Sequence, residues 1–136
     1  MRLTTRTRYA VRALVYLGSQ CNKRSITLKE IAENEDIAEK YLEQILRRLN
    51  RAGLVRTNKG PGGGYILGKP LKSIKLSDIL SAVGESYAPV FCVDDQNKNY
   101  CLRIKCCPVR PLWQDLKRIL EDFLKNHTLG DVCKKS

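Results

Sequence analysis

The chain has 136 residues, of which 43% are hydrophobic, and it carries a formal net charge of +11. This length fits one domain with a modest core, and no apolar run reaches the roughly 18 residues that a membrane-spanning helix needs, so an integral membrane protein is not expected. Residues 1–72 carry 15 Lys and Arg against 6 Asp and Glu, whereas residues 73–136 carry 10 against 8. The first half is therefore the expected contact surface for a polyanion such as nucleic acid, although a basic soluble domain has the same totals.

The first predicted helix covers residues 5–19, where apolar side chains recur at helical spacing behind a cap at Thr4 or Thr5. Its apolar stretch is interrupted by three basic residues, Arg6, Arg8 and Arg12. No small-residue cleavage site is obvious, so we interpret the segment as an amphipathic helix of a cytosolic protein rather than as a signal peptide. The three arginines can reach phosphates, although a solvated face is the simpler interpretation.

Two further helices are predicted before residue 54. Thr27 can cap the second helix and form a capping box with Glu30, three residues later. The third helix covers about residues 38–52, and Gly53 takes the left-handed position at its end. Two short helices joined by a tight turn, the second rich in polar side chains, are typical of a helix-turn-helix.

A β-hairpin is expected next, because short strands at 54–57 and 66–67 flank the glycine-rich stretch KGPGGG. Glycines permit positive backbone angles and let the main chain approach a ligand closely. A nucleotide-binding loop is disfavoured because GK[ST] at the start of a helix is missing. A hairpin directly after a helix-turn-helix is a wing, so the sequence predicts a winged helix-turn-helix.

The second half is predicted to contain a short helix at 77–83 and a last helix at about 110–126, with Pro111 in its first turn. Apolar residues recur on the last helix in steps of three and four, and a stripe this wide favours a dimer seam. The fold class is thus mainly α with a small β-hairpin. The expected organisation is a winged helix-turn-helix domain at 1–72, a connecting helix at 73–89, a cysteine-rich loop at 90–108, a dimerisation helix at 109–127 and a flexible tail at 128–136.

The chain resembles the Rrf-type winged-helix transcriptional regulators of bacteria, which include IscR, NsrR and CymR. The resemblance rests on MRLTTRTRYAVRAL, KYLEQILRRLNRAGLV and KGPGGGYILGKP, and on a cysteine loop that ends in PLW, so it covers nearly the whole chain. It implies a cytoplasmic, nucleoid-associated homodimer that binds a near-palindromic operator in double-stranded DNA. It also implies a repressor or an activator rather than an enzyme.

The same resemblance implies that Tyr41, Glu43 and Gln44 face the major groove and that Lys59 enters the minor groove. Glutamate can accept a hydrogen bond from cytosine and glutamine can bond adenine on two edges, which agrees with these assignments, although ordinary helix surface is the plain alternative. Lys59 replaces the arginine of IscR-like proteins and lacks its planar fork. The expected DNA-binding residues are Lys40, Tyr41, Glu43, Gln44, Arg47, Arg56, Lys59, Gly60, Gly62, Gly63 and Tyr65.

Four of the six cysteines lie in one polar loop, at Cys92, Cys101, Cys106 and Cys107. The resemblance implies that three of them, Cys92, Cys101 and Cys107, hold an iron–sulfur cluster, with two irons favoured over four. Thiolates are soft, anionic donors that suit such a cluster, and nearby Lys and Arg help to keep them deprotonated. The first gap, Cys-x8-Cys, is three residues longer than in IscR-like proteins, and a loop absorbs this at low cost.

The sequence does not decide which residue is the fourth ligand of the cluster. IscR-like proteins place a histidine three residues after the last cysteine, where this chain has Arg110, and NsrR-like proteins use a first-helix residue that is Arg8 here. Cys106 is a possible fourth ligand or a spare thiol, and His127 is expected to cap or pack rather than to ligate.

The leading functional prediction is a dimeric transcriptional regulator that senses iron–sulfur status, redox state or nitric oxide through the cluster. The alternatives are a zinc site, a metal-free regulator controlled by thiol oxidation or a partner protein, and a thiol oxidoreductase. Zinc is disfavoured because only Cys101 and Cys106 approximate a zinc knuckle, and the oxidoreductase because no Cys-x2-Cys opens a helix.

Overall fold

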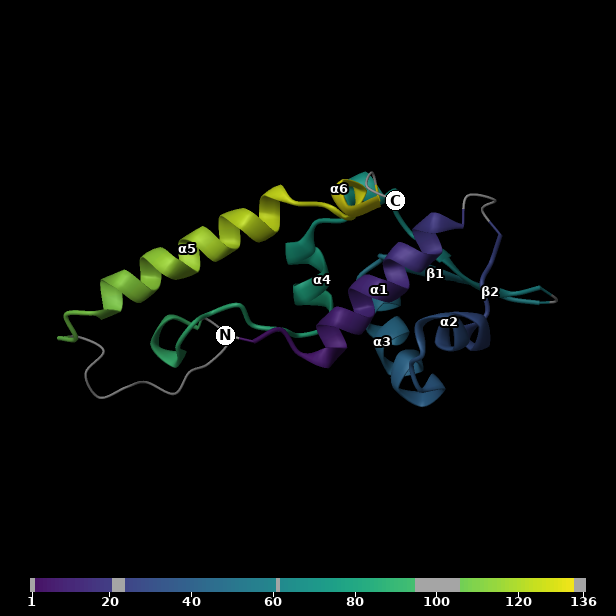
Figure 1. Ribbon diagram of the computed structural model, residues 1–136, viewed down its shortest axis with the longest axis horizontal. Coiled ribbons are helices and arrows are strands. Elements are labelled where there is room, and N and C mark those ends of the chain that lie inside the picture. Colours follow the sequence, from purple (N-terminus) through teal and green to yellow (C-terminus); the bar gives the residue numbers. More distant parts are fainter. Residues whose placement is uncertain (1, 21–23, 61, 95–105, 134–136) are drawn as a thin grey trace.

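The computed structural model describes residues 2–20, 24–60, 62–94 and 106–133. Figure 1 shows a helical body built from α1 (Thr5–Ser19), α2 (Leu28–Glu35), α3 (Glu39–Arg51) and α4 (Leu76–Ala82), with a hairpin at one end and α5 (Arg110–Asn126) extending from the other. The hairpin consists of β1 (Val55–Asn58) and β2 (Gly64–Leu67), and the short helices η1 (Leu71–Ser73), η2 (Phe91–Val93) and α6 (Leu129–Cys133) complete the elements. The mainly α fold class with one small hairpin is confirmed.

Helix starts follow the expected caps. The Thr4 hydroxyl accepts from the amide of Thr7, and the Thr27 hydroxyl accepts from the amide of Glu30 at 3.1 Å. The expected capping box at Glu30 is wrong, because its carboxylate instead accepts hydrogen bonds from Tyr16 and Arg24. Ala38, the N-cap residue of α3, provides no side-chain cap.

The hairpin is antiparallel, with Val55 opposite Leu67 and Asn58 opposite Gly64. A third segment joins its edge, since the backbone groups of Ile26 and Tyr65 exchange hydrogen bonds of 2.7 and 2.9 Å. Gly64 makes this approach possible, because a Cβ there would collide with the Ile26 carbonyl. The wing is therefore attached to the start of α2 as well as to the end of α3.

One apolar core joins the helical body, and its members share full or nearly full burial. α3 contributes Leu42, Ile45, Leu46 and Leu49, each with no exposed surface. Around them lie Ala10, Ala13, Leu14, Leu17, Ile26, Ile31, Leu54, Val55, Ile74, Ile79 and Leu129. Leu-to-Ala changes at such sites cost about 2–5 kcal/mol, so this core determines how α3 is held.

The flexible tail expected at 128–136 is wrong for its first six residues. Residues 129–133 form α6, and Leu129 is fully buried in the core. The amide of Leu129 donates to the Ile74 carbonyl and the amide of Leu76 to the His127 carbonyl, both at 3.0 Å. The chain after α5 thus returns to the helical body and packs beside α1 and η1.

The helix α5 spans Arg110–Asn126, close to the predicted 110–126, and it contacts α4 and η2. Most of its apolar stripe is exposed on this single chain, as for Leu112 at 59%, Ile119 at 65% and Phe123 at 54%. Among the described residues, no helix is both long enough and apolar enough to cross a membrane.

A buried carboxylate fastens the N-terminus of α1 to the turn after α4. Glu85 is 8% exposed, and one of its oxygens accepts from the Thr4 amide at 2.9 Å, the Thr4 hydroxyl at 2.6 Å and the Thr7 hydroxyl at 2.5 Å. Burial raises the pKa of Glu85, but these hydrogen bonds outweigh it, so the pKa lies below its usual value. The ionised form is therefore the one that the fold stabilises.

We expect Glu85→Gln to lower the free energy of unfolding by about 1–3 kcal/mol at neutral pH, because a neutral amide oxygen is a weaker acceptor than the carboxylate oxygen that receives all three hydrogen bonds. A lowered pKa also means that the Glu85 contribution is complete above the usual carboxyl pKa and is lost as the pH falls through the folded-state value. Urea titrations at neutral and acidic pH measure both effects. The variant should thus approach wild type in acid, and exposed Glu33→Gln should change little at either pH. An equal loss at both pH values would contradict this role of the ionised carboxylate.

Candidate nucleic-acid interface and thiol site

The polar face of α3 points away from the core. Lys40, Glu43, Gln44 and Arg47 are all exposed, while the opposite face of the helix is buried. The Nη2 atom of Arg47 and the Oε1 atom of Glu43 lie 3.1 Å apart, and both side chains are about half exposed or more. Such a surface pair is worth only about 0.3–0.5 kcal/mol, so both groups can exchange it for a new partner at low cost.

Tyr41 is held differently from its polar neighbours, since it is only partly exposed and packs edge-on against Tyr9 with ring centroids 5.8 Å apart. The Arg12 guanidinium lies over the other ring, 5.4 Å from the centroid of Tyr9, and forms an ion pair of 3.2 Å with Glu35. These contacts join α1, α2 and α3 near the start of α3. Arg12, for which the sequence favours a solvated face, therefore contacts Glu35 and the ring of Tyr9. Tyr9 in turn packs against Tyr41, a role that its place in an apolar stripe did not reveal.

The wing carries the remaining expected contacts. Arg56, Lys59, Gly60 and Gly62 are exposed, and Gly63 is partly exposed. Tyr65 is half-buried, and its pKa is raised first by burial and then by the negative charge of Glu43, with Arg47 acting in the opposite direction. The charges of Glu43 and Arg47 on α3 thus act on Tyr65 of β2. The exposed faces of α3 and the wing together form a basic, polar surface.

The described thiols lie on two segments. Cys92 is half-buried in η2, whereas exposed Cys106 and half-buried Cys107 immediately precede α5. None of these three is in a disulfide. Cys101, expected as the middle ligand, lies outside the described residues, as does Cys21.

Arg110 connects the two thiol segments. Its Nε and Nη2 donate to the carbonyl oxygen of Cys92 at 3.3 and 3.2 Å, and its amide donates to the carbonyl oxygen of Cys107 at 3.4 Å. From the sequence, Arg110 is only a charge that cannot ligate a metal. The structure gives it a structural role, which no local pattern could indicate because its partner is 18 residues away.

His127 packs as expected, with its ring stacked on Phe123 at a centroid distance of 4.0 Å and its Nδ1 2.7 Å from the Phe123 carbonyl oxygen. In the part of the chain that the structure describes, no three His, Cys, Asp or Glu side chains cluster as a metal site would require. The donor types still fit an iron–sulfur cluster, because the three free cysteines lie on two segments that Arg110 joins through their backbone carbonyl groups.

Comparisons with known proteins agree with this architecture. Residues 3–135 match the family model Rrf2, described as an iron-dependent transcriptional regulator. The HTH-type transcriptional regulator IscR of Klebsiella pneumoniae (strain 342) is 41% identical over 132 residues, which cover 97% of this chain and 79% of that protein. IscR of Escherichia coli (strain K12 / DH10B) is also 41% identical, with 97% and 80% covered.

Two solved structures have the same fold along the whole chain. CymR, the global cysteine regulator of B. subtilis, superposes with a TM-score of 0.81 at 26% identity and covers 100% of this chain and 98% of its own. T. potens IscR gives a TM-score of 0.76 at 29% identity, with 99% and 88% covered.

Proposed function

This chain belongs to the Rrf2 family of transcriptional regulators, and from that premise we propose that it is a homodimer whose grip on a near-palindromic operator depends on an iron–sulfur cluster held by Cys92, Cys101 and Cys107. Like its relatives, which are transcriptional regulators, it is a DNA-binding regulator and not an enzyme. The observation that carries the proposal is that Arg110 joins the two described thiol segments at the start of α5. In this proposal the protein works in the cytoplasm, bound to the nucleoid.

DNA reading is assigned to α3 and the wing. Glu43 and Gln44 are exposed on α3 and would read base edges in the major groove, with half-buried Tyr41 beside them. Lys59, with the glycines that follow it, would enter the minor groove, while Lys40, Arg47 and Arg56 contact phosphates. The wide spread of basic side chains over α3 and the wing supports this division between reading and positioning.

We expect Gln44→Ala to reduce discrimination between an operator selected from a randomised DNA pool and a scrambled duplex by about 1–3 kcal/mol. Arg56→Ala should weaken both duplexes alike and reduce the slope of log affinity against log salt by about 0.9. Fluorescence anisotropy titrations at several salt concentrations separate the two effects. An equal loss on both duplexes for Gln44→Ala would show that this side chain does not read bases.

The thiols of Cys92, Cys101 and Cys107 would hold the cluster, with two irons favoured over four, and Cys106 is the possible fourth ligand. When bound at these thiols, the cluster would supply chemistry that is sensitive to redox state and to nitric oxide. Arg110 does not compete with the thiols, because its guanidinium bonds a backbone carbonyl.

Replacing Cys92, Cys101 and Cys107 together with Ala should abolish visible absorbance, iron and sulfide in protein purified without oxygen. Cys106→Ala alone should have the same effect only if Cys106 is the fourth ligand, and Cys21→Ala serves as a control outside the loop. Operator affinity is then compared for the loaded and the iron-free wild type. Equal affinities would overturn cluster sensing while leaving DNA binding intact.

Dimerisation is assigned to α5. Five apolar side chains spaced by three or four residues remain between 38% and 65% exposed on the single chain: Val109, Leu112, Leu116, Ile119 and Phe123. A stripe of this kind is typical of a helix that packs against another helix. A second copy of the chain, related by a two-fold axis, would match the symmetry of a near-palindromic operator.

Ile119→Glu should shift the protein from dimer to monomer, because a charge would be buried at the centre of the seam. Arg118→Glu changes the neighbouring, 67% exposed side chain and should leave the dimer intact. Sedimentation velocity measures both variants. A wild-type protein that sediments as a monomer would contradict the assignment.

A metal-free regulator is the second candidate, and one observation favours it. The position that carries a ligating histidine in IscR-like proteins is Arg110, whose side chain is bound to the Cys92 carbonyl. Iron, sulfide and zinc analysis of anaerobically purified protein separates this candidate from the first. In that case the free thiols of Cys92, Cys106 and Cys107 would respond to oxidation directly.

A further inference from the structure

A cavity of about 460 Å3 lies behind the wing, away from the thiol segments. The C-terminal end of α1 forms one wall through Leu17 and Gly18, and β2 forms the other through Ile66 and Leu67. Most of its surface is apolar, and its volume is within the range of sites for small molecules, about 300–1,000 Å3. Neither the DNA surface nor the thiol site uses this space.

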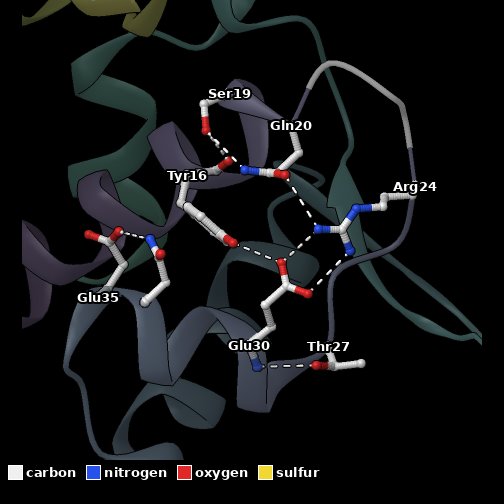
Figure 2. Close-up of polar contacts among 8 residues, drawn as sticks. Tyr16, Ser19, Gln20, Arg24, Thr27, Glu30 and Glu35 are labelled. Carbon is white, nitrogen blue, oxygen red and sulfur yellow. Dashed lines mark hydrogen bonds and ion pairs between the residues drawn. The ribbon is translucent and has the colours of Figure 1, made fainter.

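The polar groups of this cavity gather at its rim, where Gln20, Arg24 and Lys69 line it. Figure 2 shows how Arg24 is held: its Nη2 lies 2.9 Å from Oε2 of Glu30 and 3.4 Å from Oε1 of Gln20, and its Nη1 lies 3.2 Å from Oε1 of Glu30. Tyr16 also donates to Glu30 at 2.7 Å, so the carboxylate is fixed between α1 and Arg24. Glu30 thus offsets the charge of Arg24, and these contacts hold its guanidinium beside Glu30 and Gln20.

Lys69 differs from Arg24. Within the described residues its ammonium group has no hydrogen-bond or ion-pair partner, and the side chain is exposed. The mouth of an apolar cavity thus carries one uncompensated positive charge beside an ordered amide and guanidinium. A ligand that satisfies these features has an apolar body and a single anionic group.

A second cavity on the other side of Lys69 is a weaker candidate. It is lined by Arg48, Arg51 and Asp78. Both arginines lie near the C-terminal end of α3, where their charges complement the carbonyl groups of the helix, and Asp78 accepts from the Lys75 amide at the start of α4. Its charges are therefore already explained by the fold.

We propose that the cavity between α1 and β2 binds a small amphipathic monocarboxylate, with its apolar body between Leu17, Ile66 and Leu67 and its carboxylate at Lys69. This ligand site is independent of the thiol loop and of any metal. It borders β2, whose backbone pairs with Ile26 at the start of the helix-turn-helix, so its occupant would contact the base of the wing.

Decanoate, used below the concentration at which it forms micelles, is the probe, and 1-decanol is its uncharged counterpart. Binding is followed on the full chain by titration of backbone amide resonances. We expect saturable 1:1 binding of decanoate with shifts at the ends of α1 and β2. Lys69→Gln should weaken it by about twofold to fivefold, the effect of losing one exposed ion pair.

Lys72 lies three residues after Lys69 and does not line the cavity. The Lys72→Gln variant loses the same charge as Lys69→Gln, and it should bind decanoate as wild type does. Ile66→Trp should fill the cavity and abolish binding, with circular dichroism as the check on its fold. 1-Decanol should bind to wild type more weakly than decanoate does. Its affinity for Lys69→Gln should equal its affinity for wild type. Absence of saturable decanoate binding, equal effects of the two lysine variants, or equal binding of 1-decanol and decanoate to wild type would each overturn the proposal.

Discussion

The burial of one face of α3 is the constraint on which the other features depend. Leu42, Ile45, Leu46 and Leu49 have no exposed surface, and they lock the rotation of the helix about its axis. With that rotation set, Glu43, Gln44 and Arg47 must face outward, and β1 must leave the helix end in a defined direction. The polar surface is therefore a consequence of apolar packing, and Tyr9 with Arg12 refines it by fixing Tyr41 and the end of α2.

Contacts between distant segments then hold this body together at its edges. Glu85 fastens the turn after α4 to the first turn of α1, and Ile26 adds its backbone to the hairpin. Arg110 joins the two thiol segments through the carbonyl oxygens of Cys92 and Cys107. Each uses a charged or backbone group that is satisfied by a partner far away in the sequence, so each joins two segments through polar groups in addition to any apolar packing between them.

Local patterns in the sequence predicted the elements well, because helix periodicity, threonine caps and glycine punctuation are local signals. The helix starts at Thr4 and Thr27 and the left-handed Gly53 are such cases, and all were correct. The expected capping box at Glu30 and the flexible tail over residues 128–133 were wrong, because each was decided by partners elsewhere in the chain. α6 is the clearest case, since one buried residue, Leu129, in a short polar segment gives no periodicity to detect.

The return of the chain through α6 has a practical meaning for how the protein can be edited. Leu129 of α6 is buried in the core, its amide donates to the Ile74 carbonyl and α6 packs beside α1, so a chain cut after α5 loses part of the winged helix-turn-helix core. Such a shortened protein would lose DNA binding because its core is incomplete. That loss is easily misread as a regulatory role of the C-terminus. Fusion partners should be attached beyond Cys133, where they leave α6 and the buried Leu129 in place.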